Sequence, residues 1–476
     1  MYVSKLALDH FRSWSNCVLD FSPKINILLG SNGLGKTNIV ESLEVISTGT
    51  SHRVSSLMPL IEINHNCATI RANVKDFNNT FNSNTLDSSN DLNETTFELS
   101  INLKGANRAR INGKKSLYMK DIVGLVPCVS FTPRDQNLIV SDPTVRRTFI
   151  DQAGALLIPN YLPILQEYNH IAKQRSALLK SLSNNYSPNS MNNYNTVSDL
   201  EVWTAKFIKT GIILTKLRKQ IIELLNNVFS NIVKHLSNSS NFASIEYNPS
   251  FSEINFSENN FENNFENNFE NNFENNFENN FENNFENNFE ENNDNSIRLA
   301  ISEHFQRIYN GEVARGYNLI GPHRDDFTIL LNNYNAKEFA SNGESWTLAL
   351  ALKMALFKSL EKKNGKKPIV ILDDVFAQLD ESRRKQILEF AKNQDQVFIT
   401  VASLSDIPKD KSLLENSIID VSKIAKKQNE DDSKSLENNI DISHKILLEN
   451  IVNSRKNSVD YIENNQNKST DLGDIR

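Results

Sequence analysis

A glycine-rich stretch near the start of the chain has the residue types and spacing of a phosphate-binding loop. An apolar run from Ile25 leads into the pattern Gly-x-x-x-x-Gly-Lys-Thr, and apolar residues then recur at helical spacing. The glycines let consecutive backbone N–H groups face a phosphate, Lys36 adds positive charge near the β- and γ-phosphates, and the Thr37 hydroxyl can ligand Mg²⁺. We therefore expect the phosphate to be held by Gly30, Ser31, Asn32, Gly33, Leu34, Gly35, Lys36, Thr37 and Asn38.

A pair of carboxylates near the other end of the chain supplies the complementary chemistry. Four apolar residues, 369–372, run into Asp373 and Asp374, as expected for a buried strand that ends at a site. In such a pair one acid ligands Mg²⁺ and the next faces the attacking water. Lys36, Asp373 and Asp374 are the catalytic candidates, and Thr37 and Asp373 are the candidate metal ligands.

Two further stretches are compatible with chemistry but leave alternatives open. His323 to Asp326 follow a Gly-Pro break and could form either a metal site or a turn with salt bridges. Ser341 to Ser345 precede an apolar helix, where free N–H groups could hold an anion or form an ordinary N-cap.

Near the N-terminus, three side chains are candidates for weaker roles. Phe11 is expected to pack in the core, whereas Trp14 is a weak candidate for stacking on a base. Arg53 could reach a phosphate or could simply be solvated.

Asn112-Gly113 predicts a hairpin turn whose arms are basic. A solvated hairpin is the default for such a cluster, yet the cluster is also the best local candidate for contacting DNA phosphates. Its basic residues are Arg108, Arg110, Lys114 and Lys115.

Composition sets only loose limits on function. The chain has 476 residues, 39% hydrophobic residues and a formal net charge of −7, and much of the acid lies in a repeat tract and a polar C-terminal stretch. Its three widely spaced cysteines suggest neither zinc nor disulfides, and we expect them to be small buried residues. Without a signal-like segment or an apolar run of membrane-spanning length, we expect a cytoplasmic protein with no membrane partner.

The elements that must position these residues follow from periodicity. Strands are predicted at 3–8, 17–21, 67–74, 96–103, 128–131 and 397–401, and long helices at 160–182 and 199–235 with a break at 183–198. The two helices could be antiparallel and stand off the head, or could form a helical lid. Residues 78–96 are expected to be a loop insertion, and 261–288 are seven copies of Phe-Glu-Asn-Asn that we interpret as low-complexity sequence. Order returns at 297–310. Beyond about residue 409 we expect a mobile polar tail with a short helix near 441–452.

The distance in sequence between the loop near 30 and the acids near 373 dictates the domain organisation. Both ends must fold into one α/β head, with the middle of the chain as an excursion from it. We expect residues 1–155 and 311–408 to form the two halves of the head. Residues 156–310 then form a helical arm containing the insertion at about 255–293, and 409–476 form the tail.

The motif series resembles that of the RecF family of bacterial DNA replication and repair proteins. The match runs in order from about residue 1 to 405, and Gly321 to Asp326 is its most specific part. The other matching motifs are Phe11-Arg12, the phosphate loop, Ser51-His52-Arg53, Phe131-x-Pro133-x-Asp135, Ser341-x-Gly343-Glu344-Ser345 and Leu372 to Asp380.

The resemblance implies an ABC/SMC-type P-loop ATPase head with an inserted helical arm, which uses ATP and Mg²⁺ and hydrolyses ATP slowly. By the family pattern, Ser341, Gly343 and Glu344 contact the γ-phosphate held by the partner subunit of an ATP-dependent homodimer, and Asp380 faces the dimer seam. RecF proteins bind single-stranded and duplex DNA at gapped junctions, act with RecO and RecR, and help RecA to load.

Several residues depart from the general cassette pattern. Glu344 replaces a glutamine, Asp374 replaces the usual glutamate, and Thr400 lies where many cassettes have histidine. Gln378 replaces a frequent glutamate, and Pro133 lies near the place of a metal-sensing glutamine. The alternatives are another ABC-type ATPase, either an SMC-like chromosome protein or a transporter energiser. The first should carry longer coiled coils, and the second should lack the arm and the Gly-Pro-His-Arg-Asp-Asp run.

Overall fold

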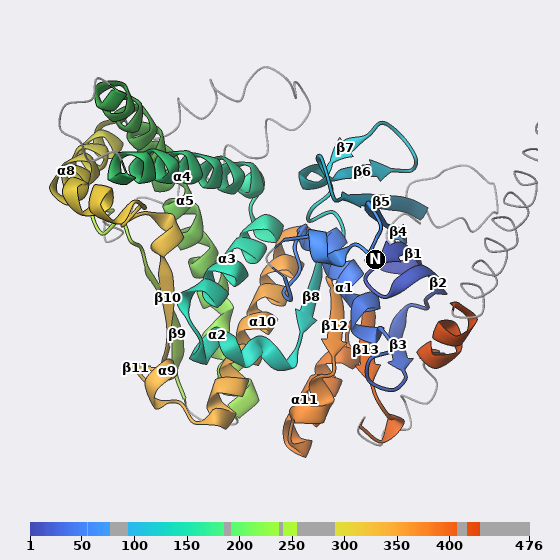
Figure 1. Ribbon diagram of the computed structural model, residues 1–476. Coiled ribbons are helices and arrows are strands. Elements are labelled where there is room, and N and C mark those ends of the chain that lie inside the picture. Colours follow the sequence, from blue (N-terminus) through green and yellow to red (C-terminus); the bar gives the residue numbers. More distant parts are fainter. Residues whose placement is uncertain are drawn as a thin grey trace, which may run out of the picture.

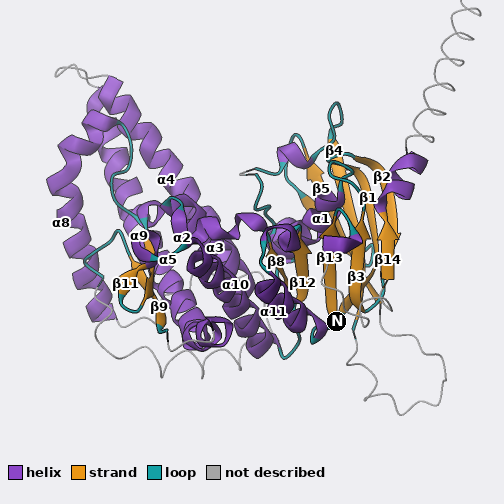
Figure 2. Cartoon of the chain, turned by 90° about the horizontal axis from the view of Figure 1, so that it is seen from below, coloured by secondary structure: helices purple, strands orange, loops and turns teal. Residues whose placement is uncertain are grey.

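The computed structural model describes residues 1–54, 56–76, 94–184, 192–237, 241–254, 291–406 and 417–428. The Phe-Glu-Asn-Asn repeats, most of the predicted loop insertion at 78–96 and the predicted helix near 441–452 lie outside these residues. Figure 2 shows the described elements as a sheet-containing part beside a mainly helical lobe.

A five-stranded parallel sheet carries both predicted groups of catalytic residues. Its strand order is β14-β3-β13-β12-β8. Side chains of β12 alternate between two cores, so Ile369 and Ile371 pack on one face while Val370 and Leu372 pack on the other. Burial on both faces explains the unbroken apolar sequence of this strand. The strands are β14 Ser417–Asp420, β3 Lys24–Leu29, β13 Gln396–Val401, β12 Ile369–Asp373 and β8 Cys128–Phe131.

A six-stranded antiparallel sheet packs over helix α1 (Lys36–Thr48) and the first face of the parallel sheet, forming one hydrophobic core. The Asn112-Gly113 hairpin turn predicted from sequence is confirmed: both residues have positive φ, and the Lys114 N–H donates to the Ile111 carbonyl at 3.0 Å. The strands are β2 Trp14–Asp20, β1 Tyr2–Phe11, β4 Cys67–Lys75, β5 Glu94–Asn102, β6 Arg108–Ile111 and β7 Leu117–Tyr118.

Helices cover the second face of the parallel sheet and continue into the helical lobe (Figure 1). Within that lobe α4 packs beside α5 and α8. The predicted helices are confirmed and are longer than expected, so that α5 begins inside the predicted break at 183–198. The helices are α2 Asn137–Val140, α3 Pro143–Leu157, α4 Tyr161–Asn184, α5 Asn192–Ser237, α8 Glu291–Arg315, α9 Ala336–Phe339, α10 Asn342–Asn364 and α11 Glu381–Lys392.

Two parts of the architecture differ from the sequence prediction. A small antiparallel sheet of β9 (Ala243–Asn248), β10 (Asp326–Leu331) and β11 (Tyr334–Asn335) was not predicted. The prediction of a mobile tail from residue 409 is wrong for residues 417–428, because β14 pairs with β3 and Val421 is fully buried. The strand there is only four residues long and contains two apolar residues, too few to distinguish from the polar flanking sequence.

Two of the three cysteines follow the prediction of burial. Cys17 and Cys128 are 2% and 3% exposed, whereas Cys67 is half-buried. Burial raises the pKa of both buried thiols to about 12, so they are inert as nucleophiles.

Candidate nucleotide-binding site

The predicted phosphate loop lies between the end of β3 and the start of α1. Gly33 and Gly35 have φ values of +87° and +86°, which are strained for any residue with a side chain. The first turn of α1 begins at Lys36, so its free N–H groups and positive dipole end lie at the loop. This is the strand-loop-helix geometry that the motif requires for binding phosphate.

The Lys36 ammonium group is held inside the loop by its own backbone. Its Nζ donates to the Gly30 carbonyl at 2.7 Å and to the Ser31 carbonyl at 3.1 Å, and the residue is 4% exposed. A buried cation with two neutral acceptors is electrostatically suited to an anionic ligand.

The turn between β1 and β2 supports this loop. The Trp14 indole donates to the Gly35 carbonyl at 3.1 Å, and Asn38 donates to the Ser13 hydroxyl at 2.9 Å. A Cβ at Gly35 would lie 2.8 Å from both the Ser13 hydroxyl and the Trp14 nitrogen, so the position has no room for a side chain. Trp14 is 1% exposed, and the suggestion that its ring stacks on a base is therefore wrong. Phe11 is fully buried, as predicted.

The acid pair meets the phosphate loop although 336 residues separate Thr37 from Asp373. The Thr37 hydroxyl donates to Asp373 Oδ1 at 3.1 Å, and the Thr400 hydroxyl donates to the same oxygen at 2.7 Å. Thr400 also accepts from the Asp374 N–H at 2.9 Å. Because β12 and β13 are parallel neighbours, Thr400 lies directly beside Asp373 and joins both acids.

The electrostatics of Asp373 fit a divalent cation. Burial raises the pKa of this carboxyl above its ordinary value, and the neighbouring Asp374 charge raises it further, against the lowering effect of the two hydroxyl donors. A carboxylate and a hydroxyl are hard oxygen ligands of the kind that Mg²⁺ prefers. The residues present therefore fit Mg²⁺, which Thr37 and Asp373 would hold.

A buried glutamate on α1 binds the basic residues Arg12 and Arg53 near the phosphate loop. Glu41 accepts two hydrogen bonds from Arg12, one from the Ser51 hydroxyl and one from Arg53 Nη1 at 2.9 Å. Burial raises the pKa of Glu41, but these donors outweigh it and hold the pKa below its usual value. Arg53 also donates to Asn38 at 2.8 Å, so it is neither simply solvated nor free to reach a phosphate without leaving these partners.

The Ser341–Glu344 stretch forms a capping box at the start of α10. The Glu344 carboxylate accepts from the Ser341 N–H at 2.9 Å, and the Ser341 hydroxyl accepts from the Glu344 N–H at 3.3 Å. Hydrogen bonds from Ser341 hold the pKa of Glu344 below its usual value. The N-cap reading is thus observed, and Ser341 remains exposed at the surface.

Two side chains from elsewhere anchor this helix start. Arg383 donates to the Gly343 carbonyl at 2.9 Å and pairs with Asp380, and Gln136 bonds to Asn342. A Cβ at Gly343 would lie 2.8 Å from the Arg383 guanidinium. In the described part of the chain, no hydrogen bond or ion pair connects residues 341–344 to the phosphate loop.

The Gly321–Asp326 run forms a turn with salt bridges and not a metal site. Asp325 is 1% exposed and accepts from Arg218 at 3.1 Å, from the Ser250 N–H at 2.7 Å and from the Tyr247 hydroxyl. His323 lies between the Tyr168 hydroxyl at 2.8 Å and the Asn318 carbonyl at 3.1 Å. The run ties α5 of the helical lobe to the small sheet.

The basic hairpin is exposed, as an interface with DNA would require. Arg108, Arg110, Lys114 and Lys115 are all exposed, and β6 and β7 project at the top of Figure 1, away from α11. Arg108 lies 4.4 Å over the Tyr118 ring, and Arg110 is 3.7 Å from Glu98.

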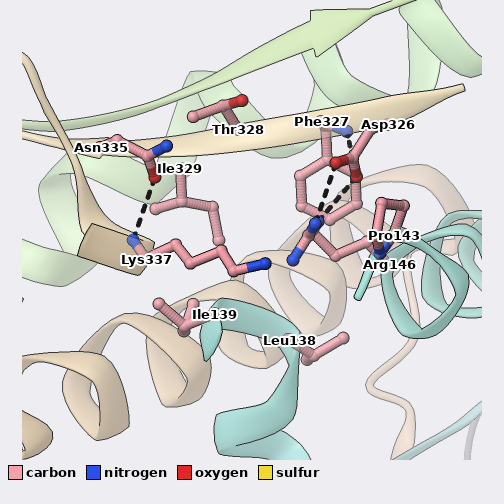
Figure 3. Close-up of a pocket in the computed structure, with 10 residues that line it drawn as sticks. All are labelled: Leu138, Ile139, Pro143, Arg146, Asp326, Phe327, Thr328, Ile329, Asn335 and Lys337. Carbon is pink, nitrogen blue, oxygen red and sulfur yellow. Dashed lines mark hydrogen bonds and ion pairs between the residues drawn. The ribbon is translucent and has the colours of Figure 1, made fainter. Parts of the chain in front are cut away.

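A cavity of about 150 Å³ lies elsewhere, between β10 and the helices α2 and α3 (Figure 3). Arg146 forms a bidentate pair with Asp326 at its edge, and the Lys337 amine extends into it. None of the nucleotide-site candidates is among its lining residues, which are Leu138, Ile139, Pro143, Arg146, Asp326, Phe327, Thr328, Ile329, Asn335 and Lys337.

The structure thus brings Lys36, Thr37, Asp373 and Asp374 to one edge of the sheet, whereas within the described residues Ser341, Gly343 and Glu344 make no hydrogen bond or ion pair with them. Sequence reasoning missed the linking role of Thr400 and the anchoring of the α10 start by Gln136 and Arg383. Thr400 could have been found from its place near the end of a predicted strand. Gln136 and Arg383 carry no local signal.

Comparisons with known proteins identify the family of this chain. A family model described as the RecF/RecN/SMC N terminal domain matches residues 2–427. A DNA replication and repair protein RecF of Bifidobacterium adolescentis is 50% identical over 91% of this chain and 94% of its own length. A solved structure of the recombination mediator protein RecF-ATPrS in the RecFOR pathway has 26% identity and a TM-score of 0.67, covering 86% of this chain and 94% of that one. A second, of RecF-ATP in the same pathway, has 27% identity and a TM-score of 0.66, covering 85% and 93%. Within the described ranges, no helix is long and apolar enough to cross a membrane.

Proposed function

This chain belongs to the RecF family of DNA replication and repair proteins, and we propose that it works as an ATP-switched DNA clamp. In this proposal ATP closes two copies on DNA at single-strand/double-strand junctions, and the clamp, acting with RecO and RecR, assists RecA loading. The fold is the predicted ABC/SMC-type ATPase head with a helical arm. ATP binding and a DNA-repair ATPase activity follow from the family.

One observation carries the ATPase part of the proposal: the phosphate loop and the acid pair are joined by the 3.1 Å bond between Thr37 and Asp373. Lys36, already inside the loop, neutralises the β- and γ-phosphates of ATP together with the backbone N–H groups and the α1 dipole. When bound, Mg²⁺ would supply charge neutralisation at the phosphates of ATP, and Thr37 and Asp373 would hold it.

Asp374 takes the catalytic-carboxylate role in this scheme. Its backbone is held in the left-handed region at φ +51°, and its N–H donates to the Thr400 hydroxyl. The backbone from which the side chain extends is therefore fixed beside Asp373. Asp374 orients the attacking water and accepts its proton. The shorter aspartate in place of glutamate is consistent with slow hydrolysis, which suits a timer for clamp opening.

The second half of the site comes from a partner copy. Ser341 is exposed at the dipole end of a 23-residue helix, and Arg383 and Gln136 hold that helix start in place. Because these residues make no bond to the phosphate loop of their own chain within the described residues, they are available to complete the loop of a second molecule. We assign Ser341, Gly343 and Glu344 to the γ-phosphate of the partner's ATP, with Asp380 near the seam.

DNA is proposed to contact the basic hairpin of β6 and β7. The proposed domain division assigns residues 1–155 and 311–408 to the head and 156–310 to the arm. We extend the head to include 417–428, since β14 pairs with β3 of its parallel sheet and Val421 packs in its core.

The test of the dimer is the Ser341→Arg variant. A bulky cation at this surface position should leave ATP binding by the same chain unchanged but abolish ATP-induced dimers, measured by light scattering with ATP, with ADP and without nucleotide. Ser198→Arg, on the exposed surface of α5, is the matched control and should dimerise like wild type. Dimers that survive in the Ser341→Arg protein would remove the in-trans site.

A gel shift on gapped DNA extends this test to the clamp. Wild type should bind more tightly with ATP than with ADP, and Ser341→Arg should lose this difference. Binding that ignores the nucleotide in wild type would contradict the ATP-switched clamp while leaving the ATPase assignment intact.

A further inference from the structure

A second cluster of ligating side chains lies outside the nucleotide site. The His10 Nδ1 is 2.7 Å from Glu62 Oε2, and the His65 Nδ1 is 3.5 Å from the same oxygen. One ligand atom from each residue lies within 4.8 Å of the other two. Among the described residues, this is the one group of three or more histidine, cysteine or carboxylate residues whose ligand atoms lie this close together.

The cluster is held by more than the three side chains. The Glu62 N–H donates to the His10 carbonyl at 2.8 Å, and the His65 N–H donates to the Glu62 carbonyl at 3.1 Å. The Ser15 hydroxyl donates to Glu62 Oε1 at 2.7 Å, leaving Oε2 to the histidines. The backbone therefore joins the end of β1 to the loop after the short helix Met58–Leu60, and a neighbouring hydroxyl orients the carboxylate.

The geometry of the cluster gathers nitrogen and oxygen donor atoms in one place. The two imidazole rings are stacked with centroids 3.7 Å apart and an interplanar angle of 15°. One nitrogen of each ring and one Glu62 oxygen are donor atoms of the kinds that can bind a single metal ion together.

We propose that His10, Glu62 and His65 bind one divalent transition-metal ion of the Zn²⁺ class. Two imidazoles and one carboxylate form a ligand set that suits zinc, with a fourth position for water, whereas Mg²⁺ prefers oxygen ligands alone. Ser15 is a positioning residue that acts through Glu62. The site lies next to the β1–β2 turn, which contains Ser13 and leads into Trp14. An ion bound there would therefore stabilise the turn that contacts the phosphate loop.

Binding is measured on the full chain without nucleotide, by Co²⁺ absorption in the visible range and by Zn²⁺ competition. Wild type should bind one tightly held equivalent that a change to Asp373→Asn leaves intact, because that change affects only the nucleotide site. Glu62→Gln, His65→Ala and His10→Asn should each weaken this binding by at least about 10–100-fold. Asparagine is chosen at position 10 because His10 has φ +49°, which alanine tolerates poorly.

Two further variants separate a built site from general histidine binding. Ser15→Ala should weaken Zn²⁺ binding by about 10-fold, while His235→Asn, which changes an exposed histidine on α5, should have no effect. Zn²⁺ should also raise the melting temperature of wild type but not of Glu62→Gln. Equal Co²⁺ affinity in wild type and Glu62→Gln, or the absence of a stoichiometric equivalent in wild type, would overturn the proposal.

Discussion

Lys36 and Asp373 show how single side chains are prepared for a charged ligand. The lysine is bound only to neutral carbonyls, and the aspartate is bound only to neutral hydroxyls. Within the described residues, neither Lys36 nor Asp373 forms an ion pair. Both therefore gain from a ligand that brings phosphate and a divalent cation together.

Lys36→Ala tests the cation directly. Removing a buried charge that meets phosphate should weaken ATP binding by two to three orders of magnitude or more, which corresponds to about 3–4 kcal/mol. The measurement is a titration with a fluorescent ATP analogue. ATP affinity within a few-fold of wild type would contradict the assignment of the loop.

Asp374→Asn is the matched variant for hydrolysis. Asparagine tolerates the left-handed backbone at this position, so the structure should be retained. ATP binding should change little, while the steady-state rate should fall by about 10²–10⁴-fold because the general base is lost. A rate equal to that of wild type would assign the water-orienting role to another group.

His323 gives a prediction for pH. Burial lowers the pKa of this imidazole from about 6.5 to about 4, against a raising effect of its bond to Asn318. The unfolded chain therefore binds more protons between these values, and the stabilising neutral state, fully present above pH 6.5, is lost as the pH falls toward 4. The loss is about 1.4 kcal/mol per pH unit and about 3 kcal/mol in total.

The measurement is urea denaturation from pH 7 to pH 4 for wild type and His323→Gln. Other groups also titrate in this range, so the difference between the two proteins isolates the histidine. His323→Gln should lose less stability on acidification, and identical slopes would show that the imidazole is not held neutral.

At the scale of elements, the Gly321–Asp326 turn connects helices and sheet through buried charge. Arg218 of α5 is bound by Asp151 of α3 at 2.9 Å and by Asp325 of the turn at 3.1 Å. Burial raises the pKa of Asp325, although Arg218 and the other donors oppose that effect. The arm and the head thus share one buried network.

Asp325→Ala should destabilise this junction strongly. It leaves Arg218 buried with one fewer partner and also removes the acceptor for Tyr247 and Ser250, so the free energy of unfolding should fall by about 3–5 kcal/mol. Glu223→Ala, which removes an exposed partner of Lys219 on the same helix, should cost less than about 0.5 kcal/mol. Both are measured by urea denaturation, and equal costs would show that the network does not carry stability.

At the scale of the whole molecule, charge is distributed unevenly. The formal net charge is −7, yet the hairpin of β6 and β7 presents four exposed basic residues at one end of the head. DNA binding to an acidic protein requires such a local surface, because phosphate contacts dominate the affinity.

Lys114→Ala combined with Lys115→Ala tests this surface. If both lysines contact phosphates, DNA affinity should fall and the slope of log K against log salt should become shallower by about 2. Lys362→Ala combined with Lys385→Ala removes the same charge from α10 and α11 and should leave the slope unchanged. The measurement is fluorescence anisotropy at several salt concentrations, and identical slopes in all three proteins would place the DNA elsewhere.

Local patterns were sufficient to predict several features from sequence alone. The strand-loop-helix around Lys36, the apolar strand ending at Asp373 and the Asn112-Gly113 turn each follow from residues adjacent in the chain, because glycine φ values, burial and periodicity act locally. The need for both chain ends to meet in one head also followed from chemistry alone.

Only the tertiary structure decided how distant residues are paired. It assigned Arg53 to Glu41, buried Trp14 under Gly35, made Asp325 a partner of Arg218 and added β14 to the parallel sheet. These pairings join residues from separate elements, and each depends on packing that no short stretch encodes. The sequence could name the groups that carry charge, but only the fold could decide which of them neutralise each other and which stay available for a ligand.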